Sequence, residues 1–225
     1  QGDCIVTSAR TAEMVKLTEN AFRDVNIAFA NELSIVCDSL EIDVWELIRL
    51  ANRHPRVSIL QPGPGVGGHC IAVDPWFIVS SAPDQAKLIR AAREVNDGKP
   101  EWVIDKVSAA LGSFLIENDE KTASDVTISC FGLSFKADVD DLRESPALSI
   151  VERLLTKTSC KILVVEPNVE KLPDSLQGAE LASSVEVASE QCDIALLLVD
   201  HKEFKTDLRL LLGGCVVVDT RGIFD

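Results

Sequence analysis

One cysteine in this sequence combines two features that display a reactive thiol, a glycine-rich approach and a nearby carboxylate. Cys70 follows glycines at positions 63, 65, 67 and 68, and Asp74 stands four residues beyond it. Glycines let the backbone adopt positive φ angles and let a substrate come close, and a thiolate attacks carbonyl carbon readily. We therefore interpret Cys70 as a candidate nucleophile, while a small buried thiol is the plain alternative.

Three more residues in the first half of the chain could assist such a thiol. Lys16 and Asn20 are four residues apart, so on a helix they project from one face and offer a cation and an amide. They would stabilise an oxyanion if that face looks into a cleft, and they would be a solvated stripe if it looks at water. Asp74 could hold or activate a water near Cys70, or it could cap a helix that opens with Pro75.

Cations in the second half of the chain are candidate partners for a phosphate. Lys136 and Arg143 flank a polar turn that follows an apolar, strand-like run, and Arg221 stands just beyond the last such run. Ligands of α/β proteins bind where parallel strands end. The alternative is that these cations pair with acidic neighbours, because residues 138–144 include four acids.

The composition disfavours several classes of protein. Its 22 basic and 36 acidic residues give a formal charge of −14, so we expect no nucleic-acid partner. No apolar run approaches the ~20 residues of a membrane span, and the opening residues lack a signal-peptide pattern, so we expect a soluble cytoplasmic protein without a membrane partner. Seven cysteines without Cys-x-x-Cys spacing and three histidines predict reduced thiols and no metal site. No glycine fingerprint for a dinucleotide follows any predicted strand.

The periodicity predicts a helical first part. A stretch without glycine or proline from Ala9 to about Leu40 predicts one long helix, and Asp43 begins a capping-box pattern for a second helix that ends near Asn52. A turn-rich stretch at 53–75 carries the glycine loop. Residues 76–115 return to a helical pattern, which the turn signals at 96–100 are expected to break into two helices. Residues 3–6 could be the end of a strand whose sheet is not otherwise present.

The second part has the pattern of a parallel α/β sheet. Four short apolar runs indicate buried strands, with helical or loop segments between them. These runs are Val126–Gly132, Lys161–Val165, Ile194–Val199 and Cys215–Asp219. A polar interruption between residues 117 and 124 predicts the boundary. We therefore expect a helical domain at 1–119 and an α/β domain at 120–225.

Three motifs in this order resemble the UDP-glucose/GDP-mannose dehydrogenase family. They are Ala12 to Phe22, Gly65-Val66-Gly67-Gly68-His69-Cys70 with Asp74, and Phe135-Lys136 with Asp141-Leu142-Arg143-Glu144-Ser145. The stretches 52–57 and 68–76 are most similar to the bacterial UDP-N-acetyl-D-mannosamine dehydrogenase branch. The resemblance covers essentially the whole chain but only the central and C-terminal parts of the family's three-part architecture. It implies a helical domain with a dimerisation helix, then a Rossmann-like UDP-sugar-binding domain, with the N-terminal NAD-binding domain absent.

The resemblance also implies a reaction, the four-electron oxidation of the sugar C6 hydroxyl to a carboxylate with two NAD as hydride acceptors. In that scheme Cys70 carries a thiohemiacetal and then a thioester. Lys16 and Asn20 stabilise negatively charged oxygen or position water, and Asp74 assists hydrolysis. The product would serve bacterial surface polysaccharide synthesis. The alternatives are another UDP-hexose as substrate, such as UDP-glucose, and a nucleotide-sugar-binding or dimerisation module without catalysis.

Binding roles follow from the same resemblance. The residues implied to contact the UDP-sugar are Gly67, Gly68, Phe135 and Lys136. Arg221 would help to hold the nucleotide end, and Arg143 would approach NAD across the interdomain cleft. Family members form homodimers through the long central helix, and an arginine that matches Arg53 or Arg56 reaches the partner's substrate site. We therefore expect a homodimer that binds a UDP-sugar, with no NAD turnover by this polypeptide alone.

Overall fold

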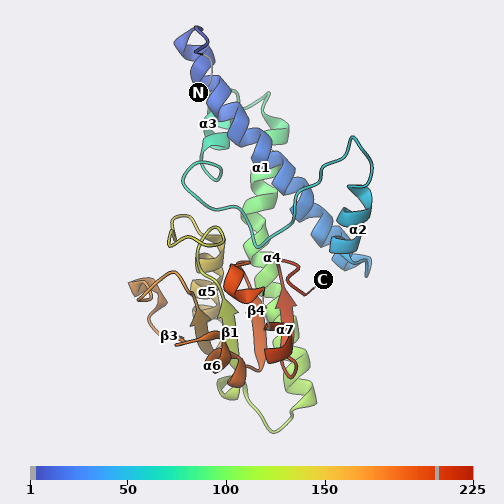
Figure 1. The fold of residues 1–225 in the computed structure, drawn as a ribbon, viewed down its shortest axis with the longest axis vertical. Helices are drawn as coiled ribbons and strands as arrows, with labels where there is room; N and C mark the ends of the chain where they lie inside the picture. The colour runs from blue at the N-terminus through green and yellow to red at the C-terminus, as the bar shows by residue number, and fades with distance from the viewer. Residues whose placement is uncertain (1–3, 206–207, 225) are drawn as a thin grey trace.

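Two long helices dominate the first half of the computed structural model, which describes residues 4–205 and 208–224 (Figure 1). Helix α1 (Ala9–Ser39) confirms the predicted long helix, and the Ser8 side chain caps its N-terminus. Helix α2 (Val44–Ala51) begins after Asp43, whose carboxylate accepts two hydrogen bonds from N–H groups of the first turn, as its capping pattern predicts. In the described part of the chain, no helix is both long enough and apolar enough to cross a membrane.

The break between the next two helices lies earlier than predicted. Helix α3 (Asp74–Ser81) ends before a short turn, and helix α4 (Lys87–Glu117) then runs without interruption through Gly98 and Pro100. The prediction of a break at residues 96–100 is therefore wrong. Proline in a helix interior costs about 3 kcal/mol. The helix continues because this turn is buried on both sides of the proline, and its packing offsets the local cost.

The first described residues do not form the predicted strand. Asp3 lies outside the described residues, while Cys4, Ile5 and Val6 are exposed and belong to no strand. A strand needs neighbouring strands for its backbone hydrogen bonds. The strands of the described chain all lie beyond residue 126, so this segment has no sheet to join.

A five-stranded parallel sheet forms the second half, which confirms the predicted α/β class. Its strands are β1 (Thr127–Phe131), β2 (Lys161–Val165), β3 (Ala179–Leu181), β4 (Ile194–Leu197) and β5 (Val216–Asp219). The four predicted strands are therefore present, and only β3 was missed, because it is three residues long and half-buried at the sheet edge. The other helices are α5 (Pro146–Lys157), α6 (Val185–Glu190) and α7 (Leu208–Leu211), with 3₁₀ turns η1 (Ala123–Asp125), η2 (Asp174–Leu176) and η3 (Lys202–Phe204).

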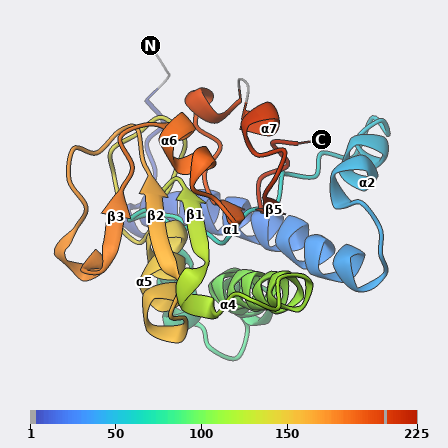
Figure 2. The same cartoon turned by 90° about the horizontal axis from the view of Figure 1, so that it is seen from below.

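The sheet is covered on both faces, so the second half has three layers (Figure 2). One core lies between the sheet and helices α4 and α5, and the other lies between the sheet and helices α6 and α7. The strand order is β3-β2-β1-β4-β5, so the direction of winding reverses between β1 and β4. Helix α4 packs on α1 as well as on α5 and β5. Because α4 belongs to both halves, the division at residue 119 stays a prediction.

Polar side chains form the contact between α1 and α4. Arg93 on α4 donates from Nη1 to Oδ1 of Asp24 on α1 over 2.6 Å, and both side chains are at most 2% exposed. Asn96 Nδ2 donates to the same Asp24 oxygen over 2.8 Å. Further along, Lys99 Nζ donates to Ser34 Oγ over 2.5 Å. The two helices are therefore joined through buried hydrogen bonds and one buried ion pair.

We expect the substitution Lys99→Met to stabilise the chain more at pH 6 than at pH 9. Burial lowers the pKa of Lys99 from 10.5 to about 7. Below pH 7 the folded state carries the full cost of a buried ammonium, and between pH 7 and 10.5 the folded lysine loses its proton before the unfolded one does, so stability rises. The advantage of the variant should therefore shrink by about 2–3 kcal/mol between pH 6 and pH 9.

Urea unfolding of both proteins at the two pH values measures this difference. Lys106→Met is the matched control, because Lys99 and Lys106 both face the Trp102 ring, at 3.5 and 5.5 Å from its centroid, but the Lys106 side chain is 37% exposed. If Lys99→Met raised the free energy of unfolding equally at both pH values, the prediction that Lys99 titrates near neutrality would be contradicted.

Candidate active site

Helix α3 brings Asp74 to the polar pair on α1. Asn20 Nδ2 donates to Asp74 Oδ2 over 2.5 Å, and Lys16 Nζ donates to Asn20 Oδ1 over 3.4 Å. Asn20 is 8% exposed, whereas Lys16 is exposed and also pairs with Glu19. Asp74 is the first residue of α3, but its carboxylate turns toward α1 instead of capping the helix. The predicted shared face of Lys16 and Asn20 therefore meets α3.

Cys70 lies in the turn that leads into α3. Its carbonyl accepts hydrogen bonds from the N–H groups of Val73 over 3.1 Å and Asp74 over 2.8 Å. The residue is partly buried and its thiol is free. Cys70 also lies near the loop after β1, because Gly68, two residues before it, donates its N–H to the Arg143 carbonyl over 3.3 Å. The cysteine is thus placed between the helical half and the sheet half.

The glycine loop packs directly against the loop that follows β1. A Cβ on Gly67 would lie 2.5 Å from the Glu144 carbonyl oxygen and 2.8 Å from the Phe135 Cβ. Gly68 has a φ of +83°, and its N–H donates to the Arg143 carbonyl over 3.3 Å. A side chain at either glycine would push the two loops apart. Both predicted glycines and the predicted Phe135 therefore meet at one contact.

The cations predicted to bind phosphate differ in their surroundings. Arg143 is bonded to both carboxylate oxygens of Asp141 over 2.6–3.1 Å, and these bonds lower the pKa of Asp141 to about 2. Arg221 donates from Nε and Nη2 to Oδ1 of Asp200 over 3.1 and 2.5 Å. Lys136 is exposed, and it forms no ion pair with any residue that the structure describes. The pairing alternative thus holds for the two arginines, although the Arg143 side chain stays 65% exposed.

Arg53 and Arg56 lie far from this group within one chain. Both follow α2, which packs beside the C-terminal part of α1, whereas α3 packs beside its N-terminal half (Figure 1). A helix rises about 1.5 Å per residue, so 20 residues of α1 span about 30 Å. Both arginines are exposed. Their predicted reach into a partner's site stays a prediction.

One residue that supports the loop was missed by the sequence analysis. Asn31 Oδ1 accepts the N–H of Gly63 over 2.9 Å, and Asn31 Nδ2 donates to Asn96 Oδ1 over 2.9 Å. A Cβ on Gly63 would also collide with the Arg221 guanidinium. The start of the glycine loop is thus held by α1, α4 and the end of β5. The available signal was the polar spacing within long helices, where Asp24 and Asn31 are seven residues apart.

A cavity of about 570 Å³ adjoins the glycine loop on its α4 side. The loop, α3, α4 and the start of α5 contribute its walls, which include Val66, Trp76, Arg93 and Pro146. Cys70 and Asn20 are not among the described residues that line this cavity. The cavity is therefore next to the group around Cys70 and is separate from it.

We expect Gly67→Ala to destabilise the chain by about 1–3 kcal/mol, because the added methyl has no room between Glu144 and Phe135. Urea unfolding gives the free energy. Gly98→Ala is the matched control, since nothing lies within 4 Å of a Cβ there and alanine favours a helix interior by about 0.5–1 kcal/mol. Equal effects of the two substitutions would contradict the close contact of the loops.

Known proteins resemble this chain along its whole length. Residues 10–98 match the central domain of the UDP-glucose/GDP-mannose dehydrogenase family, and residues 129–225 match the UDP binding domain of that family. The UDP-N-acetyl-D-mannosamine dehydrogenase of Salmonella typhi is 59% identical over 224 residues, which cover 100% of this chain and 53% of that protein. The NDP-N-acetyl-D-galactosaminuronic acid dehydrogenase of Ralstonia nicotianae is also 59% identical, over 100% of this chain and 51% of that protein.

Solved structures agree with these sequence matches. The UDP-D-ManNAc dehydrogenase of Pyrococcus horikoshii has a TM-score of 0.83 and 37% identity, covering 100% of this chain and 51% of that one. The UDP-N-acetyl-mannosamine dehydrogenase of S. aureus has a TM-score of 0.81 and 42% identity, covering 99% of this chain and 50% of that one. The chain therefore spans about half the length of the relatives it matches. Because both halves of the chain match models of one family, this chain belongs to the UDP-glucose/GDP-mannose dehydrogenase family.

Proposed function

We propose that this chain carries the catalytic cysteine and the substrate-binding part of an NAD-dependent nucleotide-sugar 6-dehydrogenase, with UDP-N-acetyl-D-mannosamine as the substrate. The observation that carries the proposal is that Cys70 lies one turn before Asp74, whose backbone N–H donates to the Cys70 carbonyl and whose carboxylate accepts from Asn20 where α1 meets α3. A nucleophile within four residues of a carboxylate that an amide orients suits acyl chemistry. A module that only binds a nucleotide sugar has no use for this set, which disfavours that alternative.

The proposed chemistry uses the Cys70 thiolate as nucleophile and as leaving group. A first two-electron oxidation converts the C6 hydroxyl of the sugar to an aldehyde. The thiolate adds to the aldehyde carbon and gives a thiohemiacetal, whose oxygen the Lys16 ammonium can stabilise. Oxidation converts this adduct to a thioester. Water then attacks the thioester carbon, Asp74 accepts a proton from that water, and the thiolate leaves to release the uronate. Asn20 orients Asp74 for this step, because its amide donates to Oδ2.

When bound, NAD accepts the hydride in each of the two oxidations. Within this chain, Arg143 fits a role toward that cofactor, because its exposed guanidinium could meet a pyrophosphate. Glu166 follows β2, where dinucleotide folds place the acid that binds ribose, but its oxygens already accept hydrogen bonds from Leu133, Ser134 and Asn168. We therefore propose that NAD is bound mainly by the part of the longer relatives that this chain does not span.

The choice of sugar is supported by the named relatives. The mannosamine and galactosaminuronic acid relatives are equally similar at 59% identity, so an N-acetylgalactosamine nucleotide is the second candidate. Both names carry an N-acetyl group, which favours an N-acetylated sugar over UDP-glucose.

Calorimetric titration of this 225-residue chain with UDP-N-acetylmannosamine, UDP-glucose and NAD tests the proposal, with absorbance of reduced NAD followed in parallel. We expect heat from the mannosamine nucleotide and no reduced NAD. Cys70→Ser should change that affinity by less than about twofold, because the thiol acts in chemistry rather than in binding. In a protein that also carries the NAD-binding domain, the same substitution should remove uronate formation.

Cys4→Ser is the control for this substitution, because Cys4 is exposed and lies outside the site. Reduction of NAD by the 225-residue chain alone would contradict the assignment of the NAD site. Uronate formation that survives Cys70→Ser would contradict the role of the cysteine.

We also propose that the chain forms a homodimer through α1. Large apolar residues repeat every seven positions on one side of this helix, and each is 44–71% exposed: Val15, Phe22, Phe29 and Val36. The opposite face, with Ala21, Asp24 and Ala28, is buried. Monomeric proteins rarely expose a continuous apolar stripe, and a seven-residue repeat is typical of paired helices. These exposures support the pairing of α1 with a second copy.

Replacing both Phe22 and Phe29 by glutamate should convert this dimer to a monomer, because the pairing would bring like charges together in place of apolar contacts. Sedimentation equilibrium measures the mass. Ile116→Glu is the control, since Ile116 is 82% exposed and lies at the far end of α4. A monomeric unsubstituted chain, or a double variant that stays dimeric, would contradict the proposal.

A further inference from the structure

The carboxyl ends of β1, β2 and β4 are joined by a buried hydrogen-bond network around Glu166. This residue follows β2, and its Oε2 accepts the N–H groups of Leu133 over 2.8 Å and Ser134 over 3.1 Å. The same oxygen lies 3.1 Å from Nε2 of His201, and neither of these two side chains is exposed at all. Oε1 accepts the N–H of Asn168 over 3.0 Å. Burial opposes ionisation, but the bonds from His201 and Leu133 prevail and lower the pKa of Glu166 to about 2.

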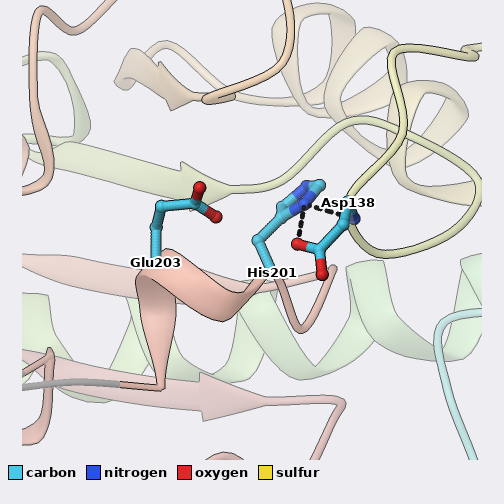
Figure 3. A group of neighbouring side chains, drawn as sticks. All are labelled: Asp138, His201 and Glu203. Carbon is cyan, nitrogen blue, oxygen red and sulfur yellow. Dashed lines mark hydrogen bonds and ion pairs between the residues drawn. The ribbon is translucent and has the colours of Figure 1, made fainter.

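His201 extends this network to the far end of the loop after β1. Its Nδ1 accepts the N–H of Asp138 over 3.0 Å (Figure 3). Its proton therefore lies on Nε2, where it is donated to Glu166. Asp138 has a φ of +59°, a backbone conformation that is uncommon outside glycine. Its hydrogen bond to His201 stabilises this turn. The loop from Leu133 to Asp138 is thus held at both ends by the Glu166–His201 pair.

The group formed by Asp138, His201 and Glu203 also has the composition of a cation site (Figure 3). The hydrogen bonds favour a different interpretation. Nδ1 of His201 accepts the Asp138 N–H, and Nε2 is bonded to Glu166, so both ring nitrogens are already engaged. A metal ion would have to displace one of these bonds. The histidine therefore holds the loop in place.

The position of this network in the sheet determines where a ligand can bind. The winding of the sheet reverses between β1 and β4, and ligands of such sheets bind in the crevice at that point. Here the N–H groups that could face a phosphate, those of Leu133 and Ser134, are bonded to Glu166 inside the crevice. A nucleotide must then contact the outer side of the loop, where Phe135 meets Gly68 and Lys136 is exposed.

We propose that Glu166 and His201 are positioning residues that hold the loop from Leu133 to Asp138 so that Phe135 and Lys136 can contact the nucleotide diphosphate of the substrate. The inference rests on the proposed function and deepens it. Both residues act through the loop and touch no reacting atom. Ser134 adds to the same arrangement, because its hydroxyl donates to the Lys136 carbonyl over 2.7 Å.

Glu166→Gln is the most direct test, because glutamine offers one acceptor and one donor where two acceptors are needed. N–H donors face both carboxylate oxygens, so either orientation of the amide sets a donor against a donor. Asp193→Asn is the matched control. Asp193 accepts the Thr127 N–H over 2.9 Å and the Lys121 ammonium over 2.8 Å, but it does so at the amino end of the sheet.

Two measurements on the 225-residue chain read the effect, at a temperature where circular dichroism finds each variant folded. The first is amide hydrogen exchange without ligand, where Leu133, Ser134 and Asp138 should exchange faster in Glu166→Gln than in the unsubstituted chain and in Asp193→Asn. The second is calorimetric titration with UDP. We expect about tenfold weaker binding for Glu166→Gln and a change of less than about twofold for Asp193→Asn.

His201→Gln is the second variant if Glu166→Gln does not fold. It keeps a donor for Glu166 but has no acceptor at the position of Nδ1, so exchange should rise at Asp138 and UDP binding should weaken. Unchanged exchange in the loop would overturn the inference, and so would faster exchange with unchanged UDP affinity. If the unsubstituted chain binds no UDP, the proposed function fails instead, and exchange still decides whether Glu166 holds the loop.

Discussion

The buried ion pair between Arg93 and Asp24 is the interaction on which the placement of the candidate site depends. It fixes α4 against α1, and Asn96 shares the Asp24 oxygen that Arg93 contacts. Burial raises the pKa of Asp24 although Arg93 opposes this. Loss of one partner from such a pair leaves an uncompensated charge and costs about 3–5 kcal/mol. Through Asn96 and Asn31, the same contact reaches the backbone of the glycine loop.

Two supports therefore converge on the glycine loop from opposite sides. The helical half supplies Asn20 and Asp74, whose hydrogen bond ties α1 to α3 just beyond Cys70. The sheet half supplies the loop after β1, whose backbone N–H groups donate to Glu166 and His201. Glycine at 67 and 68 lets the two halves touch, because side chains there would overlap Phe135. The backbone at Cys70 is thus held from both sides although the residue lies on a turn.

The periodicity of α1 correctly predicts a helix, but it does not show which face of that helix is buried. An apolar stripe on a long helix is expected to face the core of its own chain. Here Phe22 and Phe29 lie on the exposed side, while Asp24 and Asn31 are buried against α4. Polar groups tolerate burial when they are hydrogen-bonded, and Arg93 and Asn96 on α4 donate to Asp24 Oδ1 while Asn96 Oδ1 accepts from Asn31. The large apolar side chains are thereby left on the exposed face of the helix.

By itself, the sequence determined the elements and the local chemistry, because both are encoded within a few residues. The length of α1, the cap at Asp43, the four principal strands and the spacing of Lys16 and Asn20 are all of this kind. Only the tertiary structure decided that α4 continues through Pro100, that Arg221 pairs with Asp200, and that Glu166 meets His201. These outcomes depend on contacts between residues far apart in the chain, where burial can outweigh local propensity and no short pattern records the partner.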